Sequence, residues 1–266
     1  MTVDIIIPTY KPDETLCLLL HKLQGQTFVV HRVIILNTEE KLWKQAAAAY
    51  PIEQVLKELP CEYEVFHIAK KDFDHGGTRQ FGAEHSDADV MVFMTQDAVP
   101  YDKFLIGNLI KPILERESVG AAYARQLPKE NCREVEKYTR SFNYPEESRI
   151  KGKEDLPILG IKTFFCSNVC AAWRRDKYLE LGGFVKRTIF NEDMIYAGTI
   201  VKKGGKIAYC ADAQVVHSHN YSALEQFHRN FDLAVSQTMH PEIFGGIRSE
   251  SEGIRLVKKS LSYCIR

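Results

Sequence analysis

VDIIIPTYKPDETLCLLLHKLQGQTFVVHRVIILN, residues 3–37, is the stretch that decides the expected fold. It opens with a continuous β-branched run, VDIIIP, and ends with a second apolar run, RVIILN, at 32–37. Between the two runs, Pro12 and Gly25 enclose a segment whose leucines recur at helical spacing, at positions 16, 19, 20 and 23. This order predicts a buried strand, an amphipathic helix and another buried strand.

The same alternation continues toward residue 100. YEVFHI at 63–68 and DVMVFM at 89–94 are further apolar runs, EKLWKQAAAAY stops before Pro51, and a helix is expected to begin after Gly76 and Gly77. Strands that are apolar on both faces and alternate with helices predict a mostly parallel, doubly wound α/β sheet flanked by helices. Ligands of such sheets bind beyond the carboxyl ends of the strands.

Beyond residue 100 the pattern is less regular. We expect a polar stretch at 128–157 and, around it, a helix near 101–116, strands at VGAAYARQ and KIAYCADAQVV, and helices from about Asn191 and from Ser222. This half is expected to be a mixed region that covers the open end of the sheet.

Composition restricts the class of protein. The 266 residues are 45% apolar, and 35 basic residues balance 35 acidic ones. We therefore expect a globular chain without a net field, and nucleic acid is not an expected partner. The 7 cysteines lack regular spacing, which favours a reducing compartment. We expect neither a secretion signal nor a spanning helix, because no uncharged run reaches the roughly 18 residues that a span needs.

TQDAVP, residues 95–100, follows the fourth apolar run and places Asp97 at the tip of a strand. A carboxylate at that tip points into the ligand crevice and can hold Mg²⁺ or Mn²⁺ against a diphosphate. The alternative is that Asp97 caps the helix beginning near Tyr101 or orders the turn before Pro100.

FNEDM, residues 190–194, places Glu192 and Asp193 in the first turn of an expected helix. A carboxylate at a helix start beside the crevice can act as a general base on an acceptor hydroxyl. The helix dipole favours acidic residues in a first turn regardless of function, so a purely structural role is the alternative.

HSHNYS at 217–222 and DFDHGGTRQFG at 72–82 are two further polar segments. His217 and His219 alternate in phase, so they could complete a metal site begun by Asp97 or be half-buried hydrogen-bonding groups. The glycines of the second segment permit close backbone approach or positive φ, which suits either a nucleotide-binding loop or a helix cap. Their pattern is not a Walker or dinucleotide fingerprint.

Taken together, IIIPTYK, TQDAVP, the turn at Gly182-Gly183-Phe184 and the NED helix followed by HSH resemble the inverting family 2 glycosyltransferases of GT-A fold. Within that family, FDHGGTRQFGAE, ARQLP, FNYP, KTFFCSN and HSHNYS are similar to the bacterial rhamnosyltransferases that use dTDP-L-rhamnose to build cell-wall or surface polysaccharides. The resemblance covers nearly the whole chain. It implies an enzyme with one GT-A domain at 1–240, divided into a nucleotide-sugar-binding half at 1–100 and an acceptor-binding half at 101–240, and a helical tail at 241–266.

The resemblance also implies roles for individual residues. Asp193 would be the general base with Glu192 beside it, and Asp97 would bind the metal with His217 as its partner. The nucleotide sugar would be contacted by Pro8, Thr9, Tyr10, Asn37, Asp74, His75, Gly76, Arg79, Gln96 and Asp97. Acceptor contacts would come from Asn168, Trp173 and Arg174.

The chain departs from the family pattern at two places. Thr95-Gln96-Asp97 lacks the first acid of the family's DxD-type triplet, so the diphosphate and water must complete the metal coordination. Leu36-Asn37-Thr38 stands where many relatives carry an acidic turn for the pyrimidine.

The reaction implied by the resemblance is transfer of L-rhamnose from dTDP-β-L-rhamnose, with inversion, to a hydroxyl of a glycan acceptor. The acceptor would be carried on a polyprenyl diphosphate at the cytoplasmic face of the membrane, and the cofactor would be Mg²⁺ or Mn²⁺. The alternatives are a family 2 transferase using another nucleotide sugar and a non-catalytic nucleotide-sugar or glycan-binding module. EGIRLVKKSLSYCIR at 252–266 could be an interfacial helix in peripheral contact with the inner membrane face, an ordinary surface helix or a homodimer contact.

Overall fold

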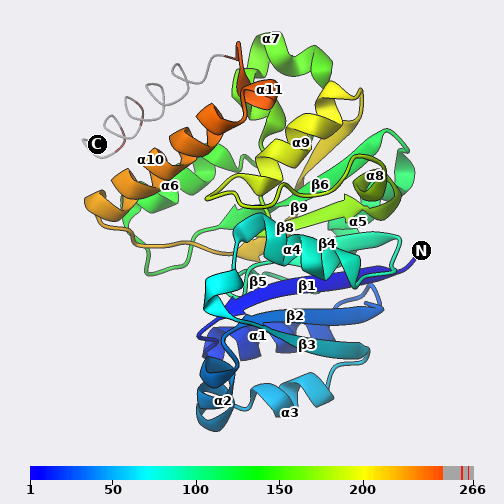
Figure 1. Ribbon diagram of the computed structural model, residues 1–266, viewed down its shortest axis with the longest axis vertical. Coiled ribbons are helices and arrows are strands. Elements are labelled where there is room, and N and C mark those ends of the chain that lie inside the picture. The colour runs from blue at the N-terminus through cyan, green and yellow to red at the C-terminus, as the bar shows by residue number, and fades with distance from the viewer. Residues whose placement is uncertain (248–258, 260–262, 264–266) are drawn as a thin grey trace.

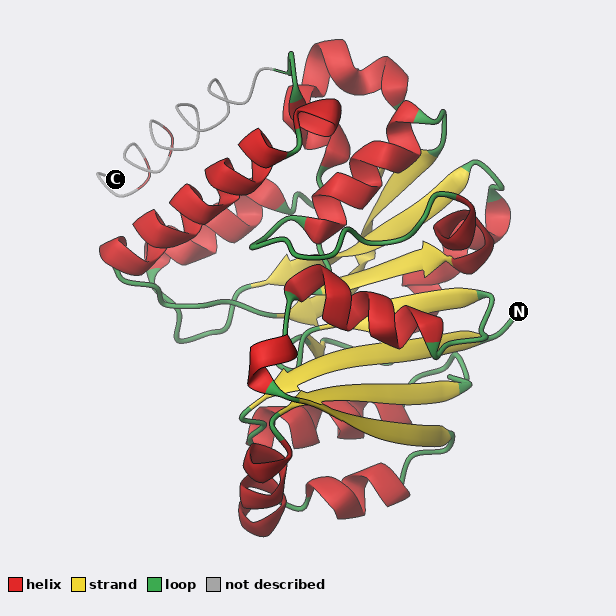
Figure 2. Ribbon diagram, viewed as in Figure 1, coloured by secondary structure: helices red, strands yellow, loops and turns green. Residues whose placement is uncertain are grey.

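The structure is a computed structural model that describes residues 1–247 together with Lys259 and Tyr263. Within that part of the chain, the strands form one nine-stranded sheet in the order β3-β2-β1-β4-β8-β6-β9-β5, with β7 paired to β9. Helices lie on both faces of this sheet (Figures 1 and 2). Apart from Lys259 and Tyr263, the expected interfacial segment at 252–266 lies outside the described residues.

The bounds of the elements are as follows. The strands are β1 Val3–Tyr10, β2 Arg32–Thr38, β3 Glu62–Ile68, β4 Val90–Met94, β5 Val99–Pro100, β6 Val119–Leu127, β7 Arg149–Lys151, β8 Cys170–Arg174 and β9 Lys206–Val216. The helices are α1 Glu14–Gln24, α2 Glu40–Ala49, α3 Ile52–Lys57, α4 His75–Glu84, α5 Leu105–Glu115, α6 Glu134–Asn143, α7 Leu156–Leu159, α8 Arg175–Glu180, α9 Glu192–Lys202, α10 Ala223–Met239 and α11 Pro241–Phe244. Short 3₁₀ turns occupy η1 Lys70–Asp72, η2 Lys153–Asp155 and η3 Gly160–Phe164.

The first four long strands form the parallel half of the sheet. β3, β2, β1 and β4 are neighbours in that order and all pair in parallel. Alternate residues of β2 enter different cores, with Val33 and Ile35 on one face and Ile34 and Leu36 on the other. Both faces are apolar because helices cover both, α1, α3 and α5 on one side and α4, α8 and α9 on the other. The expected α/β fold with a mostly parallel central sheet is confirmed.

The second half of the sheet is mixed. β8 is antiparallel to both β4 and β6, whereas β6 and β9 are parallel to each other. β5 and β7 pair with β9 in the antiparallel direction. The polar stretch at 128–157 contains α6, β7 and η2, so it is more regular than its composition indicates.

The helix expected to begin after Gly76 and Gly77 begins earlier, at His75, so that expectation is wrong by nearly one turn. Its N-cap is Asp74, whose carboxylate accepts a hydrogen bond of 2.6 Å from the Gly77 N–H. A Cβ on Gly76 would lie 1.8 Å from the carbonyl oxygen of Val185. Glycine is therefore required at position 76 by close backbone approach.

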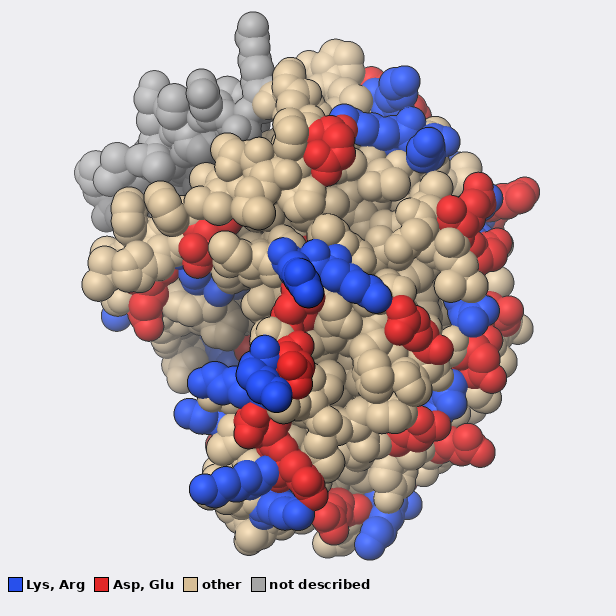
Figure 3. All heavy atoms as spheres, viewed as in Figure 1, with Lys and Arg blue, Asp and Glu red and all other residues tan. Residues whose placement is uncertain are grey.

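The parallel strands bring their carboxyl ends to one edge of the sheet. β1 points to the left in Figure 1, and α10 lies on that side. On the face seen in Figure 3, acidic and basic side chains are interspersed without a patch of one sign, as expected from the balanced composition. Among the described helices, none is both long and apolar enough to cross a membrane.

Candidate active site

A cavity of about 760 Å³ lies where β4, β6 and β9 end and α9 begins. This volume falls within the usual range for small-molecule sites. Asp97, which follows β4, and Asp193, in the first turn of α9, both line it. The two carboxylates therefore share one cavity although they are far apart in the chain.

On one wall, Asp97 meets the two histidines of the HSH segment. Oδ2 of Asp97 lies 3.4 Å from Nε2 of His217 and 3.5 Å from Nε2 of His219. The two Nε2 atoms are 3.0 Å apart, and one ligand atom from each residue lies within 4.8 Å of the others. A cation bound at about 2.1 Å to each atom would hold neighbouring ligands roughly 3 Å apart, so the three side chains fit a single divalent metal ion.

The orientation of His217 is set from outside the cavity. Arg140, on α6, donates a hydrogen bond to Oε1 of Gln126, and since arginine can only donate, this amide atom must be the oxygen. The same oxygen lies 3.0 Å from Nδ1 of His217, which therefore carries a proton. Nε2 of His217 faces Asp97, to which it donates a hydrogen bond when it carries a proton, and a metal ion would bind there in place of that proton.

The charges on this wall are also suited to a cation. Burial opposes ionisation of Asp97, but hydrogen bonding to His217 and the charge of that imidazole hold the pKa of the carboxyl well below its usual range. Burial and the neighbouring His217 lower the pKa of His219 to about 4. At neutral pH the cluster is thus an anionic oxygen beside a neutral imidazole of His219.

In the same cavity, Asp193 is held by backbone N–H groups. Its Oδ2 accepts a hydrogen bond of 2.9 Å from the N–H of Asn168, and its Oδ1 accepts one of 2.8 Å from the N–H of Met194. Burial, and next the negative charge of Glu192, raise the pKa of Asp193 to about 7. A half-buried carboxylate with such a pKa can take a proton near neutral pH, as a general base must.

Glu192 is occupied in a different way. It accepts a 3.1 Å hydrogen bond from the side-chain amide of Asn168 and forms a 3.3 Å ion pair with Arg79. Both partners of that ion pair are buried. Nε of Arg79 has no hydrogen-bond partner among the described residues, although Arg79 lines the cavity. Glu192 therefore anchors the start of α9 through two buried partners.

The residues expected to contact a nucleotide sugar divide into two groups. His75, Arg79, Gln96 and Asp97 line the cavity. Others support the loops around it: the carboxylate of Asp74 accepts from the N–H of Thr188 at 3.1 Å, besides capping α4. Gly76 packs against the backbone of Val185. Asp74 and Gly76 thus shape the site without lining it.

The expected nucleotide contacts at the ends of β1 and β2 also support the site from outside the cavity lining. Asn37 is fully buried and accepts a 3.2 Å hydrogen bond from the Thr9 hydroxyl, so its expected contact with a nucleotide is wrong for this structure. Gln96 clamps the backbone of Tyr10 through bonds of 2.9 and 3.1 Å. Pro8 is half-buried and Tyr10 is exposed, and neither lines the cavity.

Two of the three expected acceptor contacts are wrong. Trp173 is fully buried and donates a 2.9 Å hydrogen bond to Oδ1 of Asn168, so it supports the site from the core. Arg174 pairs in register with Val90 at the amino end of β4, the edge of the sheet opposite Asp97. The cause is the antiparallel direction of β8, which carries its last residues away from the cavity. Asn168 does line the cavity, beside both acids.

Several lining residues were not singled out from the sequence. Gln126, Tyr144 and Ser167 lie within ARQLP, FNYP and KTFFCSN, the segments on which the resemblance rests. The only signal for them was membership of those motifs. Arg140 and Arg229, from α6 and α10, gave none, because a basic residue on an amphipathic helix is ordinary.

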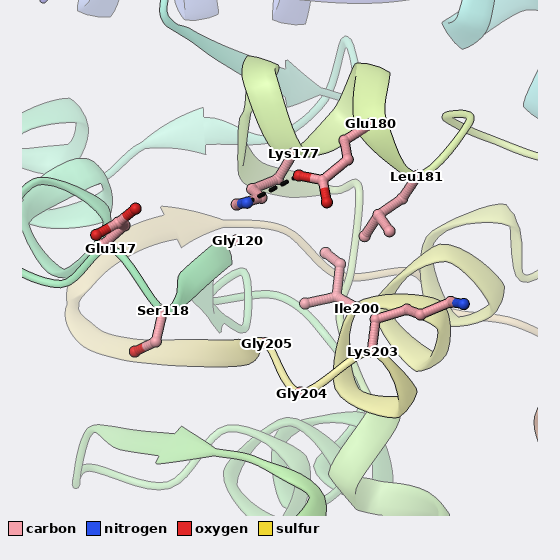
Figure 4. A pocket seen from close by; sticks show the side chains of 10 residues that line it. All are labelled: Glu117, Ser118, Gly120, Lys177, Glu180, Leu181, Ile200, Lys203, Gly204 and Gly205. Atoms are coloured by element: carbon pink, nitrogen blue, oxygen red, sulfur yellow. Dashed lines mark hydrogen bonds and ion pairs between the residues drawn. The ribbon is translucent and has the colours of Figure 1, made fainter.

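A second cavity, of about 370 Å³, lies at the opposite edge of the sheet (Figure 4). The turn at Gly204 and Gly205 forms one side, and α8, with a 2.8 Å ion pair between Lys177 and Glu180, forms another. Its other lining residues are Glu117, Ser118, Gly120, Leu181, Ile200 and Lys203. None of the residues expected at a functional site lies in this cavity.

Residues 4–182 match the family Glycosyl transferase family 2. The chain belongs to glycosyl transferase family 2. It is 38% identical over 270 residues to the O-antigen chain rhamnosyltransferase RfbN of Salmonella typhimurium, an alignment covering 100% of this chain and 82% of the relative. It is 40% identical over 203 residues to the O-antigen chain rhamnosyltransferase WbaN of Salmonella anatum, covering 75% of this chain and 64% of the relative. This family 2 member is therefore a glycosyltransferase.

Solved structures with the same fold are more distant in sequence. TarS 1–349 of S. aureus superposes with a TM-score of 0.64 at 14% identity, covering 98% of this chain and 71% of that one. The mannosyltransferase PcManGT of Pyrobaculum calidifontis, solved with GDP-Man and Mn²⁺, gives a TM-score of 0.61 at 15% identity and covers 89% and 63%. The likeness to these structures confirms the GT-A fold.

Proposed function

We propose that this enzyme transfers L-rhamnose from dTDP-β-L-rhamnose, with inversion, to a hydroxyl of a glycan acceptor in O-antigen synthesis. The two Salmonella relatives that carry the name O-antigen chain rhamnosyltransferase support the sugar and the pathway. The observation that carries the proposal is the shared cavity, which is lined both by Asp193 and by the cluster of Asp97, His217 and His219.

Asp193 is the proposed general base. Its carboxylate removes the proton from the acceptor hydroxyl, and the oxygen attacks the anomeric carbon from the face opposite the diphosphate. The bond from that carbon to the diphosphate breaks in the same step, the proton stays on Asp193, and the β-linked donor gives an α-linked product. The N–H groups of Asn168 and Met194 fix the direction from which the carboxylate acts.

Asp97, His217 and His219 are the proposed ligands of a divalent cation. We assign Mn²⁺ in preference to Mg²⁺, because two of the three protein ligands are imidazoles and Mg²⁺ favours an all-oxygen shell. The mannosyltransferase neighbour was solved with Mn²⁺, which supports this choice. When bound, the ion supplies positive charge for the diphosphate leaving group.

The halves of the domain have separate proposed tasks. Residues 1–100 would hold the nucleotide sugar, with His75, Arg79 and Asp97 from this half lining the cavity. Residues 101–240 would hold the acceptor, which we propose is linked to a polyprenyl diphosphate at the cytoplasmic face of the membrane. Asp193 belongs to this second half, so the base would approach the donor from the acceptor side.

The test is incubation with a panel of sugar nucleotides, with and without Mn²⁺, followed by mass spectrometry of a synthetic lipid-linked acceptor. We expect a gain of one deoxyhexose from dTDP-rhamnose, dependent on the metal. Transfer from a UDP- or GDP-sugar in its place would overturn the donor assignment. Absence of transfer from every nucleotide sugar, with nucleotide binding intact, would favour a non-catalytic module.

A further inference from the structure

Four basic residues line the active-site cavity, namely Arg79, Lys129, Arg140 and Arg229. Arg79 is paired with Glu192 at 3.3 Å, and Arg140 is paired with Glu136 at 2.7 Å. The side chains of Lys129 and Arg229 make no hydrogen bond or ion pair with any residue that the structure describes. Two positive charges in the cavity thus lack an anionic partner within residues 1–247, Lys259 and Tyr263.

Arg229 is nevertheless held in place. Its guanidinium lies 5.0 Å from the ring centre of Phe190 and 4.7 Å from that of Tyr221. Aromatic rings hold a guanidinium by its planar faces through cation–π attraction, whereas its N–H groups radiate from the edge. Contacts of this kind fix the group and leave its five donors for a ligand.

The aromatic contacts also connect Arg229 to the two ends of the cavity. Tyr221 stacks on His219 of the metal-binding cluster with ring centres 4.9 Å apart. Phe190 stacks on His75 of α4 with ring centres 5.4 Å apart. Arg229 therefore lies on the wall between the cluster and the expected nucleotide side.

The helix that carries Arg229 is attached to the segment before the base. The hydroxyl of Ser236 donates a 2.7 Å hydrogen bond to the carbonyl of Phe190, and the side-chain amide of Asn191 donates one of 3.3 Å to the carbonyl of Leu233. Asn191 is the N-cap of α9, which begins with Glu192 and Asp193. The position of α10, and with it of Arg229, is thus fixed relative to the base.

We propose that Arg229 binds a diphosphate group in the cavity, beside the cluster of Asp97, His217 and His219. A planar guanidinium matches two phosphate oxygens at once, and a diphosphate supplies the anion that Arg229 lacks. Negative charge grows on this group as its bond to the sugar breaks, so a fixed donor there stabilises the transition state. Phe190 and Tyr221 are positioning residues that act through Arg229.

This inference rests on the proposed function only for the source of the diphosphate. The nucleotide sugar carries one, and a lipid-linked acceptor carries another. The position of Arg229 between His75 and His219 favours the group from the nucleotide. The binding of pyrophosphate alone can be tested without knowledge of base, sugar or acceptor.

The first experiment measures the affinity of the whole chain for inorganic pyrophosphate by calorimetry, with Mn²⁺ present and absent. Arg229→Gln is expected to weaken binding about 10- to 100-fold, the loss typical of a hydrogen-bonded charge pair. Arg116→Gln, which removes the same charge from an exposed position outside the cavity lining, is the matched control and should leave affinity unchanged. Equal affinity for wild type and Arg229→Gln would overturn the proposal.

Two further variants address misfolding of Arg229→Gln and the role of the aromatic rings that hold Arg229. Arg229→Lys keeps the charge but not the planar fork, so its affinity should fall between those of wild type and Arg229→Gln. Phe190→Leu removes one of the two rings, and a smaller loss of pyrophosphate affinity is expected. If Arg229→Gln binds pyrophosphate no better than heat-denatured wild type, the variant is misfolded, and Arg229→Lys becomes the deciding variant. Full wild-type affinity in folded Arg229→Lys would then contradict the bidentate contact.

The second experiment identifies the source of the diphosphate. Titration with dTDP and with a short-chain polyprenyl diphosphate compares wild type with Arg229→Gln. Loss confined to dTDP, with a lower kcat in transfer, supports the leaving group as the ligand. Loss confined to the polyprenyl diphosphate, with a higher KM for the lipid-linked acceptor, would overturn that assignment. If wild type binds pyrophosphate but not dTDP, the donor proposal fails while the role of Arg229 stands.

Discussion

Two aspartates that line one cavity have opposite acid strengths. Asp97 lies beside His217 and His219, and these imidazoles hold its pKa well below the usual range despite burial. Asp193 lies in a buried pocket beside Glu192, and burial together with that neighbouring carboxylate raises its pKa to about 7. The same residue type thus becomes a permanent anion on one wall and a titrating group on the other.

The neighbours, more than the position at the end of an element, thus assign each carboxylate its chemistry. A permanent anion suits a cation ligand, and a group that titrates near neutral pH suits a base. If each carboxylate has the role proposed here, substitutions around Asp193 should impair proton transfer, whereas substitutions around Asp97 should impair metal binding.

The largest effect is expected on the base wall. Asp193→Asn removes the proton acceptor, and turnover should fall about 10²- to 10⁴-fold. Binding of the donor and of Mn²⁺ should be unchanged, because Asp193 is not part of the opposite cluster. The measurement is single-turnover kinetics together with calorimetric binding, and wild-type turnover in this variant would remove Asp193 from the role of base.

The stability of Asp193→Asn gives an independent control. A carboxyl whose pKa is raised by folding contributes stability at low pH that is lost as the pH rises through the folded-state pKa. With a pKa of about 7 for Asp193, this loss occurs in wild type between about pH 4 and pH 8 and is absent from the variant. The melting temperature of the variant should therefore improve relative to wild type between pH 5 and pH 8. Parallel curves would contradict the raised pKa.

The next largest effect is expected at the metal-binding cluster, from a substitution that leaves all three proposed ligands in place. Gln126→Leu removes the oxygen that fixes the proton on Nδ1 of His217, so Mn²⁺ affinity should fall about 10- to 100-fold. Gln237→Leu is the matched control, since Gln237 lines the same cavity but its side chain bonds to no described residue. Calorimetry measures the affinity of both variants for Mn²⁺. Equal losses of affinity would show that any polar residue of the cavity supports metal binding and would contradict the specific role of Gln126.

The pH profile separates the two walls in the unmodified enzyme. Below pH 7 a base with the pKa of Asp193 becomes protonated, so kcat should fall about tenfold per pH unit toward pH 5. Since the pKa of His219 is about 4, the imidazole should not contribute to this limb. Glu192→Gln removes the negative charge beside Asp193 and should move the acidic limb of the kcat profile to lower pH. Glu130→Gln removes the same charge from an exposed position and should leave that limb where it is. An unmoved limb would mean that another group titrates.

Much of the fold was predictable because the parallel strands carry their own signal. β1, β2 and β4 are apolar on both faces, and the helices between them have clear periodicity, so direction follows from the alternation. β8 gave no such signal. Its first four residues, CAAW, are small or apolar, and a run this short does not reveal whether the strand is parallel or antiparallel. The expectation for Arg174 came from the family resemblance, which did not reveal that β8 runs antiparallel to β4 and carries Arg174 away from the cavity.

The candidate site was predictable where a side chain ends an element. Asp97 after β4 and Asp193 at the start of α9 could be identified from position and residue type. Gln126 could not, because its importance depends on Arg140 from another element, which fixes the amide and, through it, the tautomer of His217. Contacts between distant segments determine such roles, and sequence patterns report mainly on neighbours in the chain.

Trp173 provides the smallest expected effect and tests this distinction directly. Its indole N–H fixes Asn168, which in turn holds both Glu192 and Asp193. Trp173→Phe removes one hydrogen bond, worth about 0.5–1.5 kcal/mol, so kcat should fall roughly two- to tenfold while KM for the acceptor stays the same. A raised acceptor KM at unchanged kcat would instead place Trp173 at the acceptor. A fully buried side chain can act on the reaction only through the residues that it positions, and the ratio of the two kinetic effects distinguishes that action from direct contact.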